Sequence, residues 1–127
     1  MSQPLQVLLV DDEPIVGRRL VPALSKDGHE VEFCDCGRDA LARIDAKSFD
    51  VVVTDVRMDD VDGLQILERV KERSPRTQVI IITGYATIEV AHEALAKGAS
   101  DFIAKPFKPN ELREVIAKAA ESLAQEG

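Results

Sequence analysis

Short apolar runs alternate with longer amphipathic stretches along the chain. The runs "VLLV", "FDVVVTD" and "VIIIT" are rich in β-branched residues and leucine, and stretches with helical spacing, such as "GLQILERVKER", lie between such runs. Strands that are apolar at successive positions are covered on both faces, which is typical of a parallel sheet between crossover helices. The pattern therefore predicts an α/β fold built from five βα units.

The predicted strands and helices alternate from one end of the chain to the other. We predict strands over 6–11, 30–34, 50–55, 78–83 and 101–104, and helices over 14–27, 38–47, 63–73, 87–97 and 109–124. Gly28 and Gly98 stand where helix ends favour a left-handed residue. Pro14 and Pro109 suit first helical turns. Pro22 lies inside the first helical pattern, where it removes a hydrogen bond, so we expect a kink or an early helix end there.

The second predicted strand indicates the order of the sheet. In "EVEFC" acids alternate with apolar residues, so this strand is half exposed and is expected at a sheet edge. An edge position favours the doubly wound, flavodoxin-like order 2-1-3-4-5, in which ligands bind beyond the carboxyl ends of the strands. Because no linker or repeat interrupts the pattern, residues 1–127 are expected to form a single domain.

The composition excludes several classes of protein. With 45% hydrophobic and 31% charged residues, the chain is expected to fold as a soluble globular protein. A formal net charge of -7 argues against direct binding of nucleic acid, which needs clustered Lys and Arg. No stretch resembles a membrane span or a signal core, so we expect a cytoplasmic protein. Cys34 and Cys36 lack partners for a metal site and are expected to be reduced thiols.

Candidate chemistry gathers at the predicted strand ends, where the sequence places Asp11, Asp12, Asp55, Thr83 and Lys105. Each has an ordinary interpretation by itself: acids can complement a helix N-terminus, the threonine can be a strand residue, and the lysine can be solvated. Together they meet at one edge of the sheet, where three carboxylates repel unless a divalent cation and a lysine offset them. A site of oxygen ligands with few carboxylates favours Mg²⁺.

Five ordered motifs, "LLVDDEP", "VVVTDVRM", "DGL", "IIITGYAT" and "GASDFIAKPF", resemble the receiver domain of two-component response regulators over nearly the whole chain. The resemblance implies a phosphoryl-accepting switch rather than an enzyme, with self-catalysed phosphorylation and dephosphorylation only. Its partners would be a sensor histidine kinase or phosphotransfer protein, and a downstream partner, an output domain or a second copy in a phosphorylation-dependent homodimer. The spellings "TGYAT" and "RM" favour the NtrC-like transcription activators.

The resemblance also assigns a role to each residue of the metal site. It implies that Asp55 is the phosphoacceptor and that Asp12 and Asp55 ligate Mg²⁺ through their side chains. Arg57 would contribute its backbone carbonyl, and Asp11 would act through a metal-bound water. A carboxylate is a poor nucleophile toward a donor of like charge, so these roles agree with the need to neutralise charge on the transferring group.

Five residues receive roles in phosphoryl binding, switching and signal lifetime. The resemblance implies that Lys105 pairs with a phosphoryl oxygen, that the Thr83 hydroxyl moves to bond the phosphoryl group, and that the Lys105–Pro106 bond is cis. Phe102 takes the position of the switch aromatic in the face made by the fourth helix, fifth strand and fifth helix, although it is equally read as core. Arg57 and Tyr85 flank the path of hydrolytic water and are expected to tune the phosphoprotein lifetime, unless they are solvated loop residues.

One segment departs from the family pattern. In "RMDDVDG", Asp59 and Asp60 replace the proline and small residue of many relatives, and the two acids are hypothesised to add weak cation affinity.

Two other classes remain as alternatives. A metal-dependent phosphohydrolase on a similar fold usually carries an Asp-x-Asp pair after its first strand, whereas here that strand ends in adjacent acids and the candidate nucleophile follows the third. A flavin-binding module on the same fold would need a Gly- or Ser/Thr-rich phosphate loop, and "DDEP" is acidic.

Overall fold

A computed structural model describes residues 4–58, 60–84 and 87–126 of the chain. The strands are β1 (Gln6–Val10), β2 (Glu30–Cys34), β3 (Val51–Asp55), β4 (Gln78–Thr83) and β5 (Asp101–Ala104). The helices are α1 (Pro14–Ser25), α2 (Gly37–Ala46), α3 (Gly63–Arg73), α4 (Ile88–Ala96) and α5 (Pro109–Glu126). The predicted elements occur in the predicted order, and their ends differ from the prediction by at most two residues.

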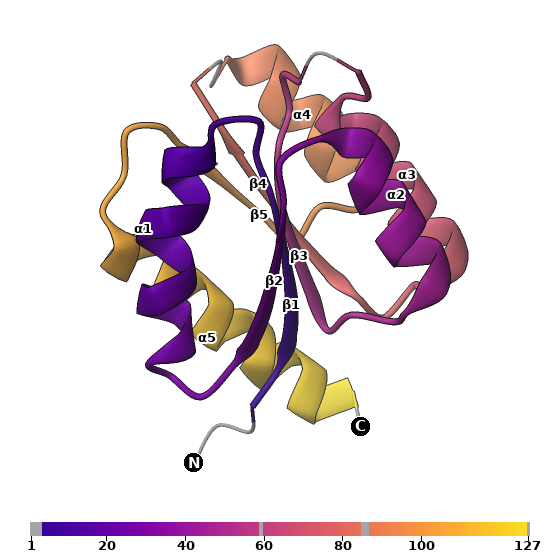
Figure 1. Cartoon of the computed structure of the whole chain (residues 1–127). Helices are drawn as coiled ribbons and strands as arrows, with labels where there is room; N and C mark the ends of the chain where they lie inside the picture. The colour runs from indigo at the N-terminus through magenta and orange to yellow at the C-terminus, as the bar shows by residue number, and fades with distance from the viewer. Residues whose placement is uncertain (1–3, 59, 85–86, 127) are drawn as a thin grey trace.

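The five strands form one parallel sheet of order β2-β1-β3-β4-β5, as predicted (Figure 1). The edge strand β2 is partly exposed, whereas every residue of the central strand β3 is buried. The prediction that β2 lies at the edge of the sheet, which was based on its alternating acids, is therefore confirmed. The unbroken apolar run of β3 likewise agrees with its central position. All five carboxyl ends meet at one edge of the sheet.

Helices cover both faces of this sheet. Figure 1 shows α1 and α5 on one side and α2, α3 and α4 on the other. The α1/α5 side is filled by one apolar cluster, to which these helices contribute Leu20, Leu24, Leu112, Ile116 and Ala119. A second cluster fills the other side, with Ala40, Ile44, Ile66, Leu67, Val70 and Ala94 from α2, α3 and α4. The strands are buried by both clusters, which holds their carboxyl ends in a fixed arrangement.

The helix ends follow the glycines and prolines of the sequence. Gly28 and Gly98 have φ of 89° and 103°, and Pro14 and Pro109 begin α1 and α5. Helix α1 continues through Pro22 and ends at Ser25, so the helix does not stop at the proline. None of the helices within the described ranges is long and apolar enough to cross a membrane.

Cys34 and Cys36 are free thiols, as predicted. Cys34 is the last residue of β2 and is buried. Burial raises the pKa of the Cys34 thiol to about 11, and the nearby negative charge of Asp39 adds to the effect. This thiol is therefore protonated at neutral pH.

Candidate functional site

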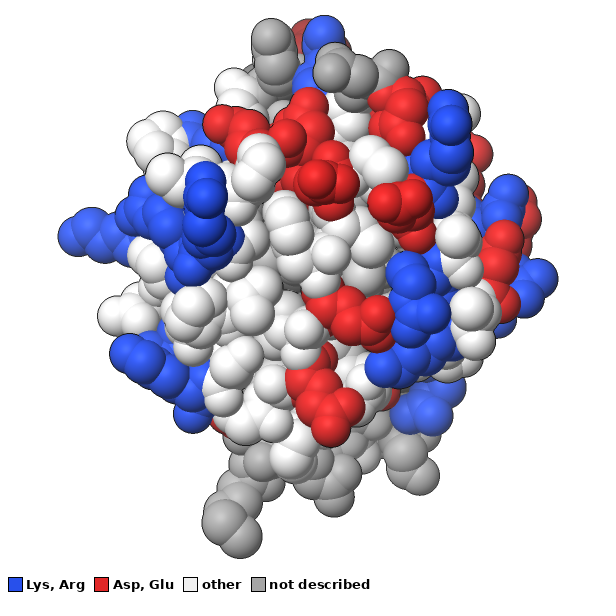
Figure 2. All heavy atoms as spheres, viewed as in Figure 1, with Lys and Arg blue, Asp and Glu red and all other residues white. Residues whose placement is uncertain are grey.

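An acid cluster lies at the carboxyl edge of the sheet and consists of Asp11, Asp12, Glu13 and Asp55. One carboxylate oxygen from each of the four lies within 4.8 Å of the other three. Asp11 is fully buried and Asp55 is 6% exposed, whereas Asp12 and Glu13 are exposed. Acidic side chains gather over this end of the molecule in Figure 2. Sequence reasoning identified three members of the cluster and missed Glu13, although Glu13 directly follows the two aspartates.

Lys105 places one ammonium group among these acids. Its Nζ donates to Asp11 Oδ2 at 2.8 Å, to Asp55 Oδ2 at 2.8 Å and to Glu13 Oε1 at 3.1 Å. Burial opposes the charge on Lys105, but these carboxylates outweigh it and raise the pKa of the ammonium group above its usual value. The Lys105–Pro106 bond is cis, as the family resemblance implied. The cluster thus has four acids and one lysine, and it keeps an excess of negative charge.

Asp11 is held at both carboxylate oxygens. Oδ2 accepts from Lys105, and Oδ1 accepts from the Glu13 backbone amide at 2.9 Å. Burial raises the pKa of Asp11, and the hydrogen bonds from Lys105 and Glu13 counteract part of that effect. Asp11 is therefore a fixed group at the floor of the cluster, out of direct reach of solvent.

Asp55 is also held from two sides. Its Oδ1 accepts from the Arg57 backbone amide at 3.2 Å, and its Oδ2 accepts from Lys105. Unlike Asp11, it ends the central strand β3, between the acids that follow β1 and the end of β4. Asp55 therefore lies at the end of the central strand, next to the acids that follow β1, with its orientation set by the loop that follows it and by the lysine.

Of the remaining predicted residues, Thr83 and Arg57 lie at this edge of the sheet. Ile82 pairs with Asp55 across the β3/β4 ladder, so Thr83 is the next residue along, and it is fully buried. Phe102 in β5 is partly buried against the α2/α3/α4 cluster, which agrees with its interpretation as core, and its switching role stays a prediction. Arg57 follows β3 and is exposed, whereas Tyr85 lies outside the described residues.

Asp60 does not join the acid cluster. Its carboxylate accepts from the backbone amides of Gly37, Arg38 and Val61 at 3.0, 2.8 and 2.8 Å. The hydrogen bond from the Arg38 amide has the largest effect in lowering the pKa of Asp60, and those from Val61 and Gly37 add to it. The hypothesis that Asp60 adds weak cation affinity stays a prediction, and its oxygens already accept hydrogen bonds from the start of α2. Asp59 lies outside the described residues.

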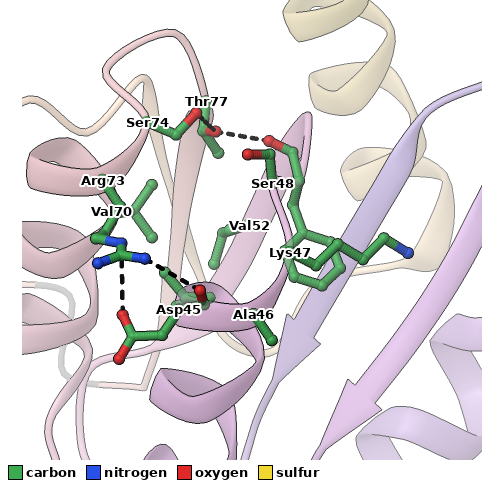
Figure 3. A pocket seen from close by; sticks show the side chains of 11 residues that line it. Asp45, Ala46, Lys47, Ser48, Val52, Val70, Arg73, Ser74 and Thr77 are labelled. Carbon is green, nitrogen blue, oxygen red and sulfur yellow. Dashed lines mark hydrogen bonds and ion pairs between the residues drawn. The ribbon is translucent and has the colours of Figure 1, made fainter.

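A pocket of about 140 Å³ lies at the other edge of the sheet, where α2 and α3 end and β3 and β4 begin (Figure 3). Arg73 reaches across it and donates to the backbone carbonyl of Asp45 at 3.1 Å. Thr77 Oγ1 donates to the Phe49 carbonyl at 2.6 Å. The pocket shares no residue with the acid cluster, so it is separate from the candidate site.

The chemistry of the acid cluster fits a magnesium ion. All four members offer carboxylate oxygens, which are hard ligands. One lysine leaves their charge only partly balanced, and the exposed position of Asp12 keeps one side open to water and phosphate. This is an arrangement that Mg²⁺ favours, because it retains waters and binds through few carboxylates.

The fold and the site together define a receiver-type domain, and comparison with known families agrees. The model of the response regulator receiver domain matches residues 7–117, so the chain belongs to this family. It is 40% identical over 114 residues to the regulatory protein AtoC of Escherichia coli K12, covering 90% of this chain and 25% of AtoC. It is 39% identical over 117 residues to the transcriptional regulatory protein TrcR of Mycobacterium tuberculosis, covering 92% of this chain and 44% of TrcR. The chain thus spans less than half the length of these relatives.

Solved structures of receiver domains superpose closely on this chain. A CheY-like receiver domain protein from Methanospirillum hungatei JF-1 has a TM-score of 0.94 at 30% identity, covering 98% of this chain and 100% of that protein. The beryllofluoride-activated NtrC4 receiver domain dimer has a TM-score of 0.87 at 36% identity, covering 93% of this chain and 98% of that one. These likenesses support the NtrC-like prediction, and the alternative of a phosphohydrolase finds no support.

Membership in the family establishes the general function. Receiver domains are signalling switches that receive phosphoryl groups from histidine kinases, and this chain is a phosphoacceptor domain of that kind.

Proposed function

We propose that Asp55 is the residue that accepts the phosphoryl group, from a sensor histidine kinase, a phosphotransfer protein or a small acyl phosphate. The observation that carries the proposal is that Asp55 ends the central strand β3 within the acid cluster, where Lys105 Nζ and the Arg57 amide orient its carboxylate. Asp11 shares the lysine but is fully buried. Asp55 is therefore the better placed of the two to meet a donor.

In the proposed reaction, a carboxylate oxygen of Asp55 forms a new bond to phosphorus. The P–N bond of phosphohistidine, or the P–O bond of an acyl phosphate, breaks at the same time, and the leaving group departs with the bonding pair. Lys105 offsets negative charge on the transferring phosphoryl oxygens, because its ammonium group lies 2.8 Å from the accepting carboxylate. The Arg57 amide holds the other carboxylate oxygen in place.

The proposal includes a magnesium site in the acid cluster. Asp12 and Asp55 would hold Mg²⁺ through their side chains, Arg57 through its backbone carbonyl and Asp11 through a bound water. When bound, the cation supplies positive charge that offsets the charge of the phosphoryl oxygens.

The output of the switch is proposed to be the face made by α4, β5 and α5. Thr83 ends β4 beside Asp55, and Phe102 lies in the neighbouring strand β5, so both link the site to this face. We assume two conformations of this face, and a phosphoryl group on Asp55 can favour one of them only if it makes different contacts in each. The proposed contact is a hydrogen bond with the Thr83 hydroxyl. The face would then control a downstream partner, an output domain or a second copy, in the cytoplasm where kinases supply the phosphoryl group.

Labelling with acetyl phosphate tests the assignment of Asp55. Intact-mass measurement should show one added phosphoryl group in the presence of Mg²⁺, and a chelator should abolish it. The Asp55→Asn variant should not be labelled, whereas Asp39→Asn, which removes an exposed acid elsewhere, should label normally. Full acid-labile labelling of Asp55→Asn would refute the assignment, and turnover of an external phosphoester would reopen the phosphohydrolase alternative.

Amide hydrogen exchange tests the output face. With beryllofluoride, a mimic of the phosphoryl group, exchange should change across residues 84–107 and stay constant in α1. Identical exchange with and without the mimic would contradict the proposed coupling.

The lifetime of the phosphorylated state is proposed to depend on Arg57 and Tyr85. Hydrolysis needs a water in line with the leaving carboxylate, and bulky polar side chains at the rim obstruct its approach. Replacing both residues with alanine should shorten the phosphoprotein lifetime while Asp55 still labels. An unchanged or longer lifetime after removal of the donor would show that both are ordinary loop side chains.

A further inference from the structure

The loop between β3 and α3, residues 56–62, connects the proposed phosphoacceptor to the rest of the domain and is held firmly at its far end. The Gly63 amide donates to the Val56 carbonyl at 2.8 Å. A Cβ atom at Gly63 would overlap the backbone carbonyl of Asp55 itself. Asp62 caps α3 in a capping box with Gln65. The loop therefore starts and ends against the same stretch of backbone, and its shape depends on what its middle contacts.

The middle of this loop is attached to α2. Asp60 Oδ1 accepts from the Gly37 amide at 3.0 Å, and Asp60 Oδ2 accepts from the Arg38 amide at 2.8 Å. These are the first two residues of α2, whose N-cap residue Cys36 makes no side-chain cap. The first amides of a helix have no partners within the helix, and a carboxylate is favoured there by the helix dipole. Asp60 thus supplies, from another segment, the cap that α2 lacks.

Packing makes the same attachment independently of the hydrogen bonds. A Cβ atom at Gly37 would lie 2.6 Å from Val61 Cβ and 2.7 Å from the Val61 carbonyl oxygen, both too close for any real side chain. Glycine at this position lets the loop lie directly on the start of α2. Met58 and Val61 also pack against the apolar cluster that α2 and α3 share. The described part of the loop, residues 56–58 and 60–62, is therefore held by hydrogen bonds from α2 to a charged carboxylate and by apolar contact.

The attachment reaches the site through the backbone. The Arg57 amide, three residues before Asp60, donates to Asp55 Oδ1 at 3.2 Å. Met58 lies between them in the chain and is itself packed. A shift of Asp60 and Val61 away from α2 is expected to move the Arg57 amide, and with it the Asp55 carboxylate that accepts from that amide.

We propose that Asp60 is a positioning residue for phosphoryl transfer: by binding the first amides of α2 it fixes the loop that aims Asp55. This inference rests on the proposed role of Asp55 as the acceptor. In this role Asp60 contacts neither the phosphoryl donor nor the cation, and its carboxylate oxygens accept from backbone amides.

The rate of acetyl phosphate labelling tests this proposal in four variants. Asp60→Ala removes the attachment, and Asp60→Asn keeps one acceptor oxygen. Gly37→Ala leaves the carboxylate in place but pushes the loop away through Val61. Asp39→Asn is the matched control, because it removes an exposed acid from the first turn of the same helix. Urea unfolding of each variant gives the folded fraction, to which the rate is normalised.

The maximal labelling rate of Asp60→Ala should fall about tenfold, because misplacing a reacting group by about 1 Å costs up to about a hundredfold. The acetyl phosphate concentration for half-maximal rate should stay the same, because Asp60 does not touch the donor. Asp60→Asn should recover part of the rate, Gly37→Ala should be slowed, and Asp39→Asn should match the wild type. The NMR signal of the Arg57 amide should move in Asp60→Ala and not in Asp39→Asn.

Wild-type rates in folded Asp60→Asn and Gly37→Ala would overturn the proposal, even if Asp60→Ala failed to fold. Equal slowing of Asp39→Asn would also overturn it, because the effect would then come from charge at the helix terminus. A wild-type protein that takes no label at all would instead count against Asp55 as acceptor, so the two failures are distinguishable.

Discussion

Replacing Asp12 with asparagine should stabilise the protein in the absence of divalent cations. An oxygen of Asp12 lies within 4.8 Å of oxygens of the three other acids in the cluster. Two unit charges at that separation repel by about 0.9 kcal/mol in a medium like water, which suits the exposed position of Asp12. Three such repulsions, partly offset by attraction to Lys105, leave a net cost of about 1 to 2 kcal/mol. The free energy of unfolding of Asp12→Asn should rise by that amount at low salt.

Adding Mg²⁺ should reverse the order of stability, so that the wild type becomes more stable than Asp12→Asn. A cation that binds only the folded state stabilises it in proportion to the logarithm of its concentration over Kd. The wild type should therefore gain stability as Mg²⁺ is added, whereas Asp12→Asn has lost a proposed ligand and should gain much less. Urea unfolding in chelator and over a series of Mg²⁺ concentrations measures both effects. Glu121→Gln, which neutralises an exposed acid on α5, controls for the change in net charge.

A lower stability of Asp12→Asn than of the wild type in chelator, with Glu121→Gln unchanged, would contradict this prediction. That result would mean that local contacts of Asp12 outweigh its repulsion by the other acids. A high-salt repetition adds a second check, because the gain from Asp12→Asn should shrink as exposed charges are screened.

Three further predictions concern stability and reactivity. Gly63→Ala should lower the free energy of unfolding by about 1 to 3 kcal/mol in urea, because the added Cβ meets the Asp55 carbonyl; without that clash the change would stabilise the protein through its unfolded state. Cys34, with a pKa of about 11, should react slowly with iodoacetamide at pH 8 when folded and rapidly in urea, as followed by mass spectrometry. The hydrogen bond from Arg43 lowers the pKa of Glu32 below its ordinary 4.5, so its contribution is present above that pH and lost as pH falls further. The stability difference between wild type and Glu32→Gln, at most about 1 kcal/mol at pH 7, should therefore close below pH 4.5.

Most of the fold could be predicted because local signals and burial agree along this chain. The unbroken apolar run of β3 and the alternating acids of β2 predicted their central and edge positions, and the glycines after α1 and α4 marked the helix ends. A kink or an early helix end was expected at Pro22; the helix does not end there, and the kink stays a prediction. The proline lies in the last turn of α1, and the helix continues past it because Leu20 and Leu24 bury that stretch against the sheet.

The acids of the site could be predicted for a geometric reason. In a parallel sheet all carboxyl ends share one edge, so residues that end β1 and β3 or follow β5 must approach one another even when they lie far apart in sequence. Asp11, Asp55 and Lys105 follow this rule. The number of acids was less predictable, because Glu13 belongs to the cluster only through the turn that leads from β1 into α1.

The contact between Asp60 and α2 could not be predicted from the sequence. Helix caps are sought in the residue that precedes the helix, and that search succeeds for α3 and α4, which are capped by Asp62 and Thr87. At α2 the same position holds Cys36, which provides no cap, and the carboxylate comes from a residue 23 positions away from Gly37. A helix without a cap in its own sequence still has N-terminal amides that need hydrogen-bond acceptors. An acid that departs from the family pattern in a nearby loop can supply the accepting carboxylate. The missing local cap and the unexplained acid are thus two signs of one tertiary contact, and each is visible in the sequence only once the other is taken into account.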